Sequence, residues 1–172
     1  MLGGRNAMIR PENESDCQAV RRVHVAAFPT DAEARLVDSL RAAGRLLVSL
    51  VVEVDGAVVG HVAFSPVTIG SADARGGVGL GPVAVHPDFQ RCGIGKRLVR
   101  DGLAACRADG YAFCVVLGEP AYYTRFGFAP AARWKLTNEY GAGPEFMACE
   151  LREGGVPVAG GLVRYAPEFA DL

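Results

Sequence analysis

The sequence predicts an α/β fold with a mixed, twisted sheet, and three local patterns support this prediction. Residues 80–85 form an apolar run typical of a buried strand, and a glycine-rich turn and an amphipathic helical pattern follow directly. Residues 46–54 and 57–67 are strand-like runs joined by Asp55 and Gly56, a pair that favours the type I′ turn of a β-hairpin. Two further helical patterns precede this hairpin, so helices and strands are interspersed along the chain.

The N-terminal part is expected to hold one strand and two helices. Residues 8–10 are read as a short strand. Asp16 is a candidate N-cap for a helix that ends at Phe28, and Asp31 is a candidate N-cap for a second helix that ends at Gly44. The hairpin then supplies the second and third strands, and the third strand ends near Pro66.

The remaining elements are predicted from alternating apolar runs and turn residues. In chain order we expect a loop at 70–79, a strand at 80–85, a turn at 86–88, a helix after Gly93, a strand at 112–117, a short helix at 120–126 closed by Gly127, an irregular stretch at 134–144, and strands at 146–151 and 161–165. The order β-α-α-β-β-β-α-β-α-β-β amounts to about seven strands and about four helices.

Composition indicates one globular domain over residues 1–172. Half of the residues are hydrophobic, which is enough for a substantial core. No apolar run approaches the roughly 18 residues of a membrane span, and the N-terminal residues lack the pattern of a secretory signal. We therefore expect a soluble, cytoplasmic protein that does not bind a membrane.

Charge and cysteine content exclude other classes. The net charge of −1 provides no general attraction for nucleic acid. The five cysteines contain no CxxC pair, so we expect reduced thiols and neither a disulfide framework nor a metal site.

The glycine-rich turn at residues 90–96 (QRCGIGK) is the most informative stretch of the chain. Gly93 and Gly95 let the backbone turn tightly, so that successive N–H groups and the positive end of the following helix dipole can converge on an anion such as phosphate. A P-loop would need Ser or Thr after Gly95 and Lys96, where this chain has Arg97, and a dinucleotide fingerprint would need a third glycine. Neither alternative fits well.

Two motifs together resemble those of the GNAT family of acyl-CoA-dependent N-acetyltransferases. The first is residues 81–95 (GPVAVHPDFQRCGIG), similar to the family's cofactor strand, turn and pyrophosphate loop. The second, about 30 residues further on, is residues 122–128 (YYTRFGF), similar to the family's tyrosine helix and its exit. The resemblance implies a GNAT fold with a mostly antiparallel sheet, acetyl-CoA as acyl donor, no metal, and an amine acceptor.

The resemblance also implies which residues bind the cofactor. The pantetheine arm would pair with the backbone of Val83 and Val85, and the phosphates would lie against the turn, where Arg91 and Lys96 add positive charge. The basic residues Arg100 and Arg107 are better explained as a solvated helix face. The predicted cofactor-binding residues are Val83, Ala84, Val85, Gln90, Arg91, Cys92, Gly93, Ile94, Gly95, Lys96, Glu119 and Tyr122.

Tyr123 matches the family's general acid, because it lies four residues before Gly127. A phenol is protonated at neutral pH and can donate its proton to the departing thiolate. Tyr122 is better explained by aromatic packing, and Cys92 by a small side chain in a tight loop rather than by a nucleophile.

The general base stays open. Several family members have a glutamate on the cofactor strand, but Val83, Ala84 and Val85 carry no carboxylate. Glu119 is better explained as a helix cap, and His61 and His86 as structural residues, although His61 would be a candidate if it faced the acceptor; a water-mediated route is a further alternative.

The sequence therefore predicts an N-acetyltransferase that transfers an acetyl group directly from acetyl-CoA to a primary amine. A non-catalytic acyl-CoA-binding sensor or interaction module is the alternative, because the cofactor strand lacks the carboxylate; a different nucleotide binder is a weaker one. The acceptor is a small-molecule amine or a protein or peptide amine. A homodimer is expected through an exposed edge of the final strands.

Overall fold

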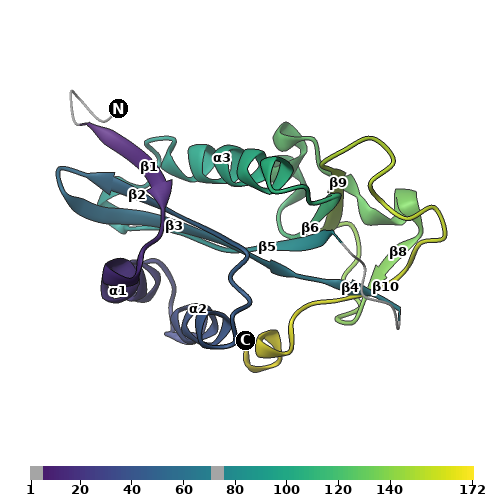
Figure 1. The fold of residues 1–172 in the computed structure, drawn as a ribbon, viewed down its shortest axis with the longest axis horizontal. Helices are drawn as coiled ribbons and strands as arrows, with labels where there is room; N and C mark the ends of the chain where they lie inside the picture. Colours follow the sequence, from purple (N-terminus) through teal and green to yellow (C-terminus); the bar gives the residue numbers. More distant parts are fainter. Residues whose placement is uncertain (1–5, 71–75) are drawn as a thin grey trace. The chain divides into compact units, whose positions relative to one another are not determined.

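The computed structural model describes residues 6–70 and 76–172. The larger sheet is seven-stranded, in the order β1-β2-β3-β5-β6-β9-β7, and a smaller three-stranded sheet has the order β4-β10-β8 (Figure 1). The larger sheet consists of β1 (Ala7–Pro11), β2 (Val48–Val54), β3 (Ala57–Pro66), β5 (Gly77–Val85), β6 (Phe113–Leu117), β7 (Ala129–Pro130) and β9 (Phe146–Glu150). The smaller sheet consists of β4 (Thr68–Ile69), β8 (Leu136–Asn138) and β10 (Gly161–Arg164).

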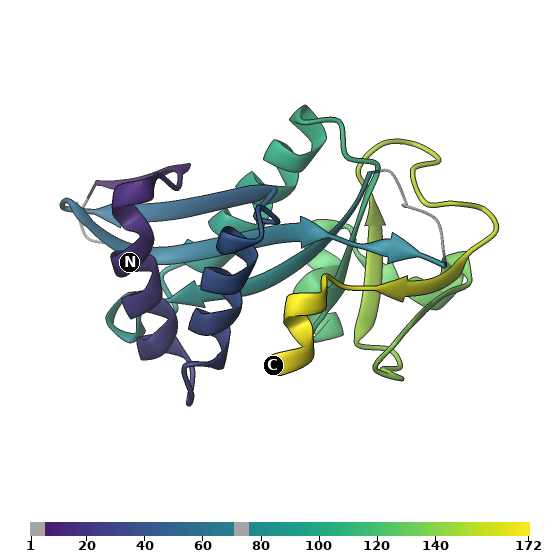
Figure 2. The same ribbon diagram turned by 60° about the horizontal axis from the view of Figure 1, so that its bottom comes forward.

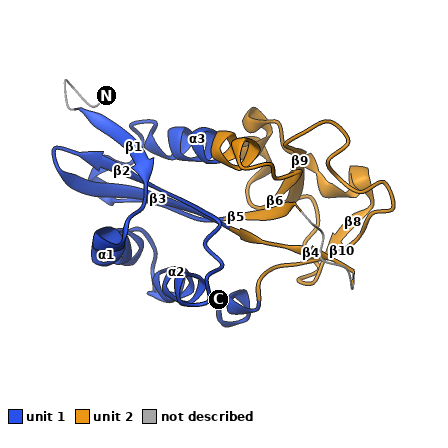
Figure 3. Ribbon diagram, in the orientation of Figure 1, with its two compact units in different colours: residues 1–64, 81–102, 167–172 blue, residues 65–80, 103–166 orange. Residues whose placement is uncertain are grey.

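Four α-helices and several short 3₁₀ helices complete the described part of the chain. The α-helices are α1 (Cys17–Ala27), α2 (Ala32–Ala42), α3 (Ile94–Ala108) and α4 (Pro120–Tyr123). The chain divides into two compact units, coloured separately in Figure 3. Unit 1 contains residues 1–64, 81–102 and 167–172, and unit 2 contains residues 65–80 and 103–166.

In unit 1, α1 and α2 lie side by side over one face of β1, β2 and β3, and the first part of α3 lies on the opposite face (Figures 1 and 2). Val20, Val37 and Val51 form a buried cluster between the two N-terminal helices and the sheet. A 3₁₀ helix, η5 (Pro167–Asp171), contacts α2, and Glu168 pairs with Arg45.

The predicted hairpin is confirmed. Strands β2 and β3 pair antiparallel, and the turn residues Asp55 and Gly56 have φ angles of 50° and 81°, as a type I′ turn requires. The predicted ends of the first two helices are also confirmed, since α1 stops before Phe28 and Gly44 follows α2 with a φ of 67°.

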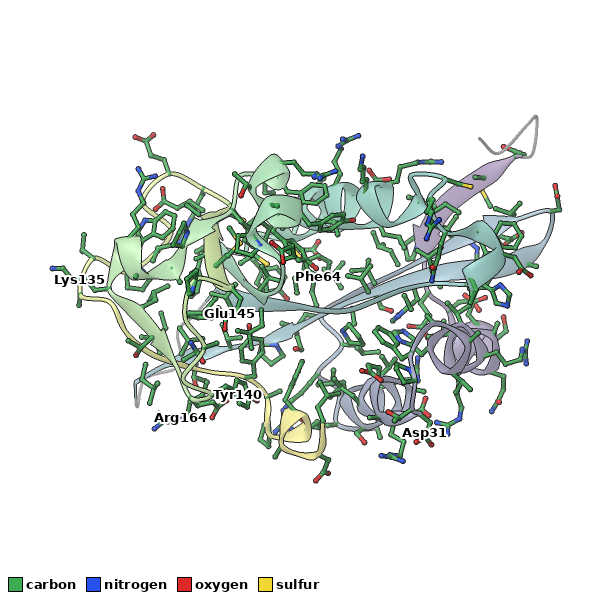
Figure 4. All side chains as sticks on the ribbon, turned by 180° about the vertical axis from the view of Figure 1, so that it is seen from behind. Asp31, Phe64, Lys135, Tyr140, Glu145 and Arg164 are labelled. Atoms are coloured by element: carbon green, nitrogen blue, oxygen red, sulfur yellow. The ribbon has the colours of Figure 1, made fainter. Side chains whose placement is uncertain are left out.

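Asp16 and Asp31 occupy the predicted N-cap positions of α1 and α2, but neither side chain makes the expected cap hydrogen bond to its helix, because each carboxylate binds an arginine. Asp16 accepts hydrogen bonds from Arg10 at 2.6 and 2.9 Å, and Asn13 caps the 3₁₀ helix (Glu14–Asp16) that leads into α1. Asp31, shown beside α2 in Figure 4, pairs with Arg35 at 2.5 Å and makes no side-chain cap bond to α2, whose first amide, that of Ala32, donates to Thr30 Oγ1 at 3.3 Å. A guanidinium can bind both oxygens of a carboxylate, as Arg10 does with Asp16, whereas a backbone amide offers a single donor.

Strand β5 begins at Gly77, in unit 2, three residues earlier than the predicted start at residue 80. Residues 71–75 of the predicted loop lie outside the described residues, but Gly77 and Gly79 belong to β5 and pair with β6. Their missing side chains leave room for aromatic rings: a Cβ on Gly77 would be 2.4 Å from the ring of Phe113, and one on Gly79 would be 2.8 Å from Tyr165. Glycine there reflects packing, not a loop.

The irregular stretch predicted after Trp134 contains a strand, β8, and the smaller sheet was not predicted at all. The prediction that the last two strands offer an exposed edge for dimer formation is also wrong. Strand β9 lies between β6 and β7, and β10 lies between β4 and β8, so both have strand neighbours on each side. In the described residues, no helix combines the length and apolar character needed to cross a membrane.

Candidate functional site

The predicted anion-binding turn lies in unit 1, between the end of β5 and the start of α3. His86 fixes the start of the turn. Its backbone N–H donates to the carbonyl of Val59 at 2.8 Å, and Nδ1 of its ring accepts from the backbone amide of Asp88 at 3.3 Å. The side-chain amide of Gln90 donates to the carbonyl of Val85 at 3.0 Å. Hydrogen bonds from His86 and Gln90 therefore attach residues 86–90 of the turn to the backbone of β3 and β5.

The second half of the turn brings the backbone into the helix. Arg91 and Gly93 have φ angles of 61° and 83°, and a Cβ on Gly93 would have nothing within 4 Å. Ile94 and Leu98 are buried and anchor the first turn of α3. The amides of a first helical turn have no carbonyl one turn back, so they can bind an anion in the open space beside Gly93.

Positive charge lies beside this turn. Arg91 and Lys96 are exposed, and neither makes an ion pair within the described part of the chain. Arg97 instead donates to the carbonyl of Ala7 at 3.4 Å. On β5, Ala84 is buried while Val83 and Val85 are only half-buried. The turn thus combines free helix amides, two free cations and open space, which are the features that hold a pyrophosphate.

Tyr123 lies in unit 2 at the end of α4, which is built by local hydrogen bonds. The side chain of Glu119 accepts from the amide of Ala121 at 3.4 Å, and its carbonyl accepts from the amides of Tyr122 and Tyr123 at 2.9 and 3.1 Å. Glu119 therefore acts as the predicted N-cap. Gly127, with a φ of 91°, ends the following 3₁₀ helix, as predicted.

The Tyr123 ring is packed among aromatic side chains. Its centroid is 5.0 Å from that of Tyr122, 5.7 Å from that of Phe128 and 6.3 Å from that of Phe126. Burial, with smaller effects from Tyr122 and Cys114, raises the pKa of Tyr123 to about 12. The phenol is therefore protonated at neutral pH, and in the described residues no hydrogen-bond acceptor engages its hydroxyl. Tyr122 packs edge-on against its neighbours, as predicted for it.

His61 belongs to a buried polar network in unit 1 that sequence reasoning missed. His61 Nδ1 is 2.8 Å from His24 Nε2, and His61 Nε2 is 2.8 Å from Ser49 Oγ and 3.4 Å from Glu12 Oε2. Ser49 Oγ also donates to Glu12, and Arg41 pairs with Glu12 at 2.5 Å. Both histidines are completely buried. The network is consistent with the structural role predicted for His61.

The hydrogen bonds fix the tautomer of each ring. Burial opposes ionisation of Glu12, but bonds from His61 and Ser49 and the charge of Arg41 outweigh it and lower the pKa of Glu12 to about 2. The carboxylate can only accept, so His61 carries its proton on Nε2 and accepts on Nδ1. His24 must then donate from Nε2, which leaves the unpartnered Nδ1 as a lone pair.

The turn at the N-terminus of α3 and the protonated phenol on α4 lie in the two motifs that resemble the GNAT class of acyltransferases. The family model described as "Acetyltransferase (GNAT) family" matches residues 16–128, and the chain belongs to this family. The predicted resemblance and the predicted α/β fold are thereby confirmed.

Curated relatives agree with this assignment. The uncharacterized N-acetyltransferase YhbS of Escherichia coli K12 is 38% identical over 164 residues, covering 94% of this chain and 98% of YhbS. The uncharacterized N-acetyltransferase YjhQ of the same strain is 38% identical over 123 residues, covering 70% of this chain and 68% of YjhQ.

Solved structures are similar over nearly the whole chain. The crystal structure of E. coli YhbS in complex with CoA has a TM-score of 0.92 and 37% identity, covering 97% of this chain and 93% of YhbS. A GNAT family acetyltransferase from Brucella melitensis in complex with acetyl-CoA has a TM-score of 0.80 and 40% identity, covering 95% of this chain and 98% of that protein.

Proposed function

We propose that this protein is an acetyl-CoA-dependent N-acetyltransferase that transfers the acetyl group directly to a primary amine, with Tyr123 as the general acid. The observation that carries the proposal is the half-buried, protonated phenol of Tyr123, in a chain whose turn before α3 leaves open space beside Gly93. The solved relatives that bind CoA and acetyl-CoA support the choice of donor. Residues 1–172 are proposed to act as one domain, since β5 and α3 each continue through both compact units.

The residues predicted for the donor fit its phosphates. The first-turn amides of α3 and the side chains of Arg91 and Lys96 would hold the pyrophosphate, and the open side of Gly93 provides the space for it. The backbone of Val83 and Val85 would pair with the pantetheine arm. Glu119 and Tyr122 are already engaged in capping and packing, so a cofactor contact by either one is an additional role.

Transfer forms a C–N bond and an S–H bond and breaks a C–S bond and an N–H bond. The amine nitrogen attacks the thioester carbonyl, the C–S bond breaks, and Tyr123 donates its proton to the departing thiolate. The products are an N-acetyl amine and the thiol of CoA. The proton lost by the amine passes to water, because residues 83–85 carry no carboxylate and His61 is enclosed in the core.

Calorimetry tests the donor site. The titrants are acetyl-CoA, CoA and ADP, and Gly93→Glu places bulk and negative charge where the pyrophosphate should bind. Gly44→Glu is a matched control, because Gly44 also has a positive φ, 67°, and nothing within 4 Å of a Cβ. We expect Gly93→Glu to abolish acetyl-CoA binding and Gly44→Glu to retain it. Absence of binding by folded wild-type protein would refute the proposal.

Turnover tests the acid. Tyr123→Phe should lower kcat by about 10²-fold or more, the usual range for a lost general acid, with little change in acetyl-CoA affinity. An unchanged kcat would remove Tyr123 from that role.

The missing carboxylate on β5 favours a second candidate function, a non-catalytic acyl-CoA-binding module. Tight acetyl-CoA binding without transfer to any amine in a panel of polyamines, amino acids and lysine peptides would support it, and multiple turnover would exclude it.

Two further parts of the proposal concern the cellular location and the oligomeric state of the protein. We propose a cytoplasmic location and a homodimer that forms through a surface other than an edge of β9 or β10, and sedimentation of the purified protein at several concentrations tests the dimer.

A further inference from the structure

The ring of Tyr123 lies directly against the backbone of Gly118. A Cβ on Gly118 would be 2.2 Å from Cε2 of Tyr123, 2.8 Å from Cδ2 and 3.2 Å from Cζ. Real Cβ atoms essentially never come within 3.0 Å of a non-bonded heavy atom of another residue. Gly118 is not among the glycines with positive φ, so its backbone conformation alone would accept any residue. The space taken by the Tyr123 ring is what requires glycine at this position.

Both sides of this contact are held in place. The amide of Gly118 donates to the carbonyl of Glu145 at 2.9 Å, at the point where β6 ends. On the ring's other sides, Tyr122 and Phe128 pack against it edge-on, with interplanar angles of 85° and 77°. The ring is therefore held between a fixed peptide and two aromatic side chains, so a Cβ on Gly118 can displace it only by disturbing its packing against Tyr122 and Phe128.

We propose that Gly118 is a positioning residue for the proton donor: its lack of a side chain sets the place of the Tyr123 phenol for transfer of its proton to the leaving thiolate. This inference rests on the proposed function of Tyr123. Gly118 itself touches no reacting atom and acts through the ring that lies on it.

The expected effect follows from the distances. To bring the ring from 2.2 Å to the 3.4 Å at which ordinary contact begins, Gly118→Ala must displace it by about 1.2 Å. Misplacing a catalytic group by about 1 Å can cost about 10²-fold in rate. We therefore expect Gly118→Ala to lower kcat about 100-fold and to leave the KM for acetyl-CoA nearly unchanged.

The experiment combines four variants: Gly118→Ala, Tyr123→Phe, their double variant, and Gly143→Ala. Gly143 is the matched control, because the nearest atom to its Cβ is a flexible Glu145 oxygen at 3.6 Å. Thiol release from acetyl-CoA is measured with the best amine of the panel above. If Gly118 acts through Tyr123, the double variant has the kcat of Tyr123→Phe alone. Losses that multiply in the double variant, or a wild-type kcat in Gly118→Ala, would overturn the inference.

A second readout does not depend on turnover. With tyrosine labelled with ¹³C at Cζ, the signal absent from Tyr123→Phe identifies Tyr123, and Gly118→Ala should shift that signal and its titration midpoint while Gly143→Ala should not. If Gly118→Ala fails to fold, Gly118→Ala with Tyr123→Ala should fold as Tyr123→Ala does; failure of that double variant would place the clash elsewhere and overturn the inference. A wild-type kcat in Tyr123→Phe would instead refute the acid assignment.

Discussion

Acidification from pH 7 to pH 5 should destabilise this protein, because unit 1 buries two histidines in neutral form. Burial, followed by the neighbouring His61, lowers the pKa of His24 from 6.5 to about 3, and burial lowers the pKa of His61 as well. Between pH 6.5 and pH 3 the unfolded chain therefore binds protons at His24 that the folded protein does not. The stabilisation is complete above pH 6.5 and is lost as the pH falls through this window.

The magnitude follows from linkage. Each pH unit below 6.5 costs up to about 1.4 kcal/mol for one such histidine, so the 1.5 units down to pH 5 remove about 2 kcal/mol through His24 alone. His61 acts in the same direction. Glu12, with its pKa lowered from 4.5 to about 2, adds its own loss only below pH 4.5, so it does not contribute between pH 7 and pH 5. From α2, Arg41 faces the network through its ion pair with Glu12, and it also pairs with Asp38.

Urea unfolding at pH 7 and pH 5 measures the effect. We expect the free energy of unfolding of the wild type to fall by about 2 kcal/mol or more, and His24→Gln, which retains an amide donor toward His61, to show a smaller fall. His86→Asn is the control, because the His86 ring lies at the surface with 38% of its side chain exposed. Equal stability of the wild type at both pH values, or an undiminished fall in His24→Gln, would refute the reasoning.

Three further predictions concern stability. Gly102→Ala should destabilise the protein by about 1–3 kcal/mol in chemical denaturation, because its Cβ would be 2.3 Å from the ring of the buried Phe64; unchanged stability would show that the ring moves freely. Asn138→Ala removes three side-chain hydrogen bonds of 2.8–3.0 Å to a loop and should lower the stability of unit 2 by about 2–3 kcal/mol, with faster amide exchange in that loop as the measurement. Asp16→Asn removes the carboxylate that binds Arg10 at 2.6 Å and should lower the melting temperature by several degrees at pH 7, whereas the same substitution in a variant that already lacks Arg10 should have a smaller effect.

The sequence was most informative where local chemistry decides the structure. The hairpin turn needs positive φ at two adjacent positions, and Asp55-Gly56 is the pair that supplies it. The N-cap of α4 likewise depends on Glu119 and the amides next to it in sequence. The family resemblance came from two short motifs that lie in the turn before α3 and in α4, where spacing along the chain is directly related to geometry.

Errors came where distant residues decide the outcome. Asp16 is a reasonable cap by type and position, but Arg10 competes for its carboxylate. Gly77 is read as a loop residue until the ring of Phe113 is seen to need the space. The histidine network depends on the register that brings β1, β2 and β3 together, which no local pattern reveals. The one available signal was His24 itself, a polar side chain on the apolar stripe of α1.

The composition of unit 1 has a consequence for the protein during synthesis. Its last part, η5 at Pro167–Asp171, contacts α2 and supplies the partner of Arg45, but it is made only after residues 103–166 have been translated. During synthesis, helix α2 therefore lacks its contact with η5 until all of unit 2 has been translated. Folding of unit 2 also requires two separate parts of the chain, because residues 65–80 are translated well before residues 103–166. We expect nascent chains stalled before residue 167 to be more sensitive to protease at α2 than the released protein.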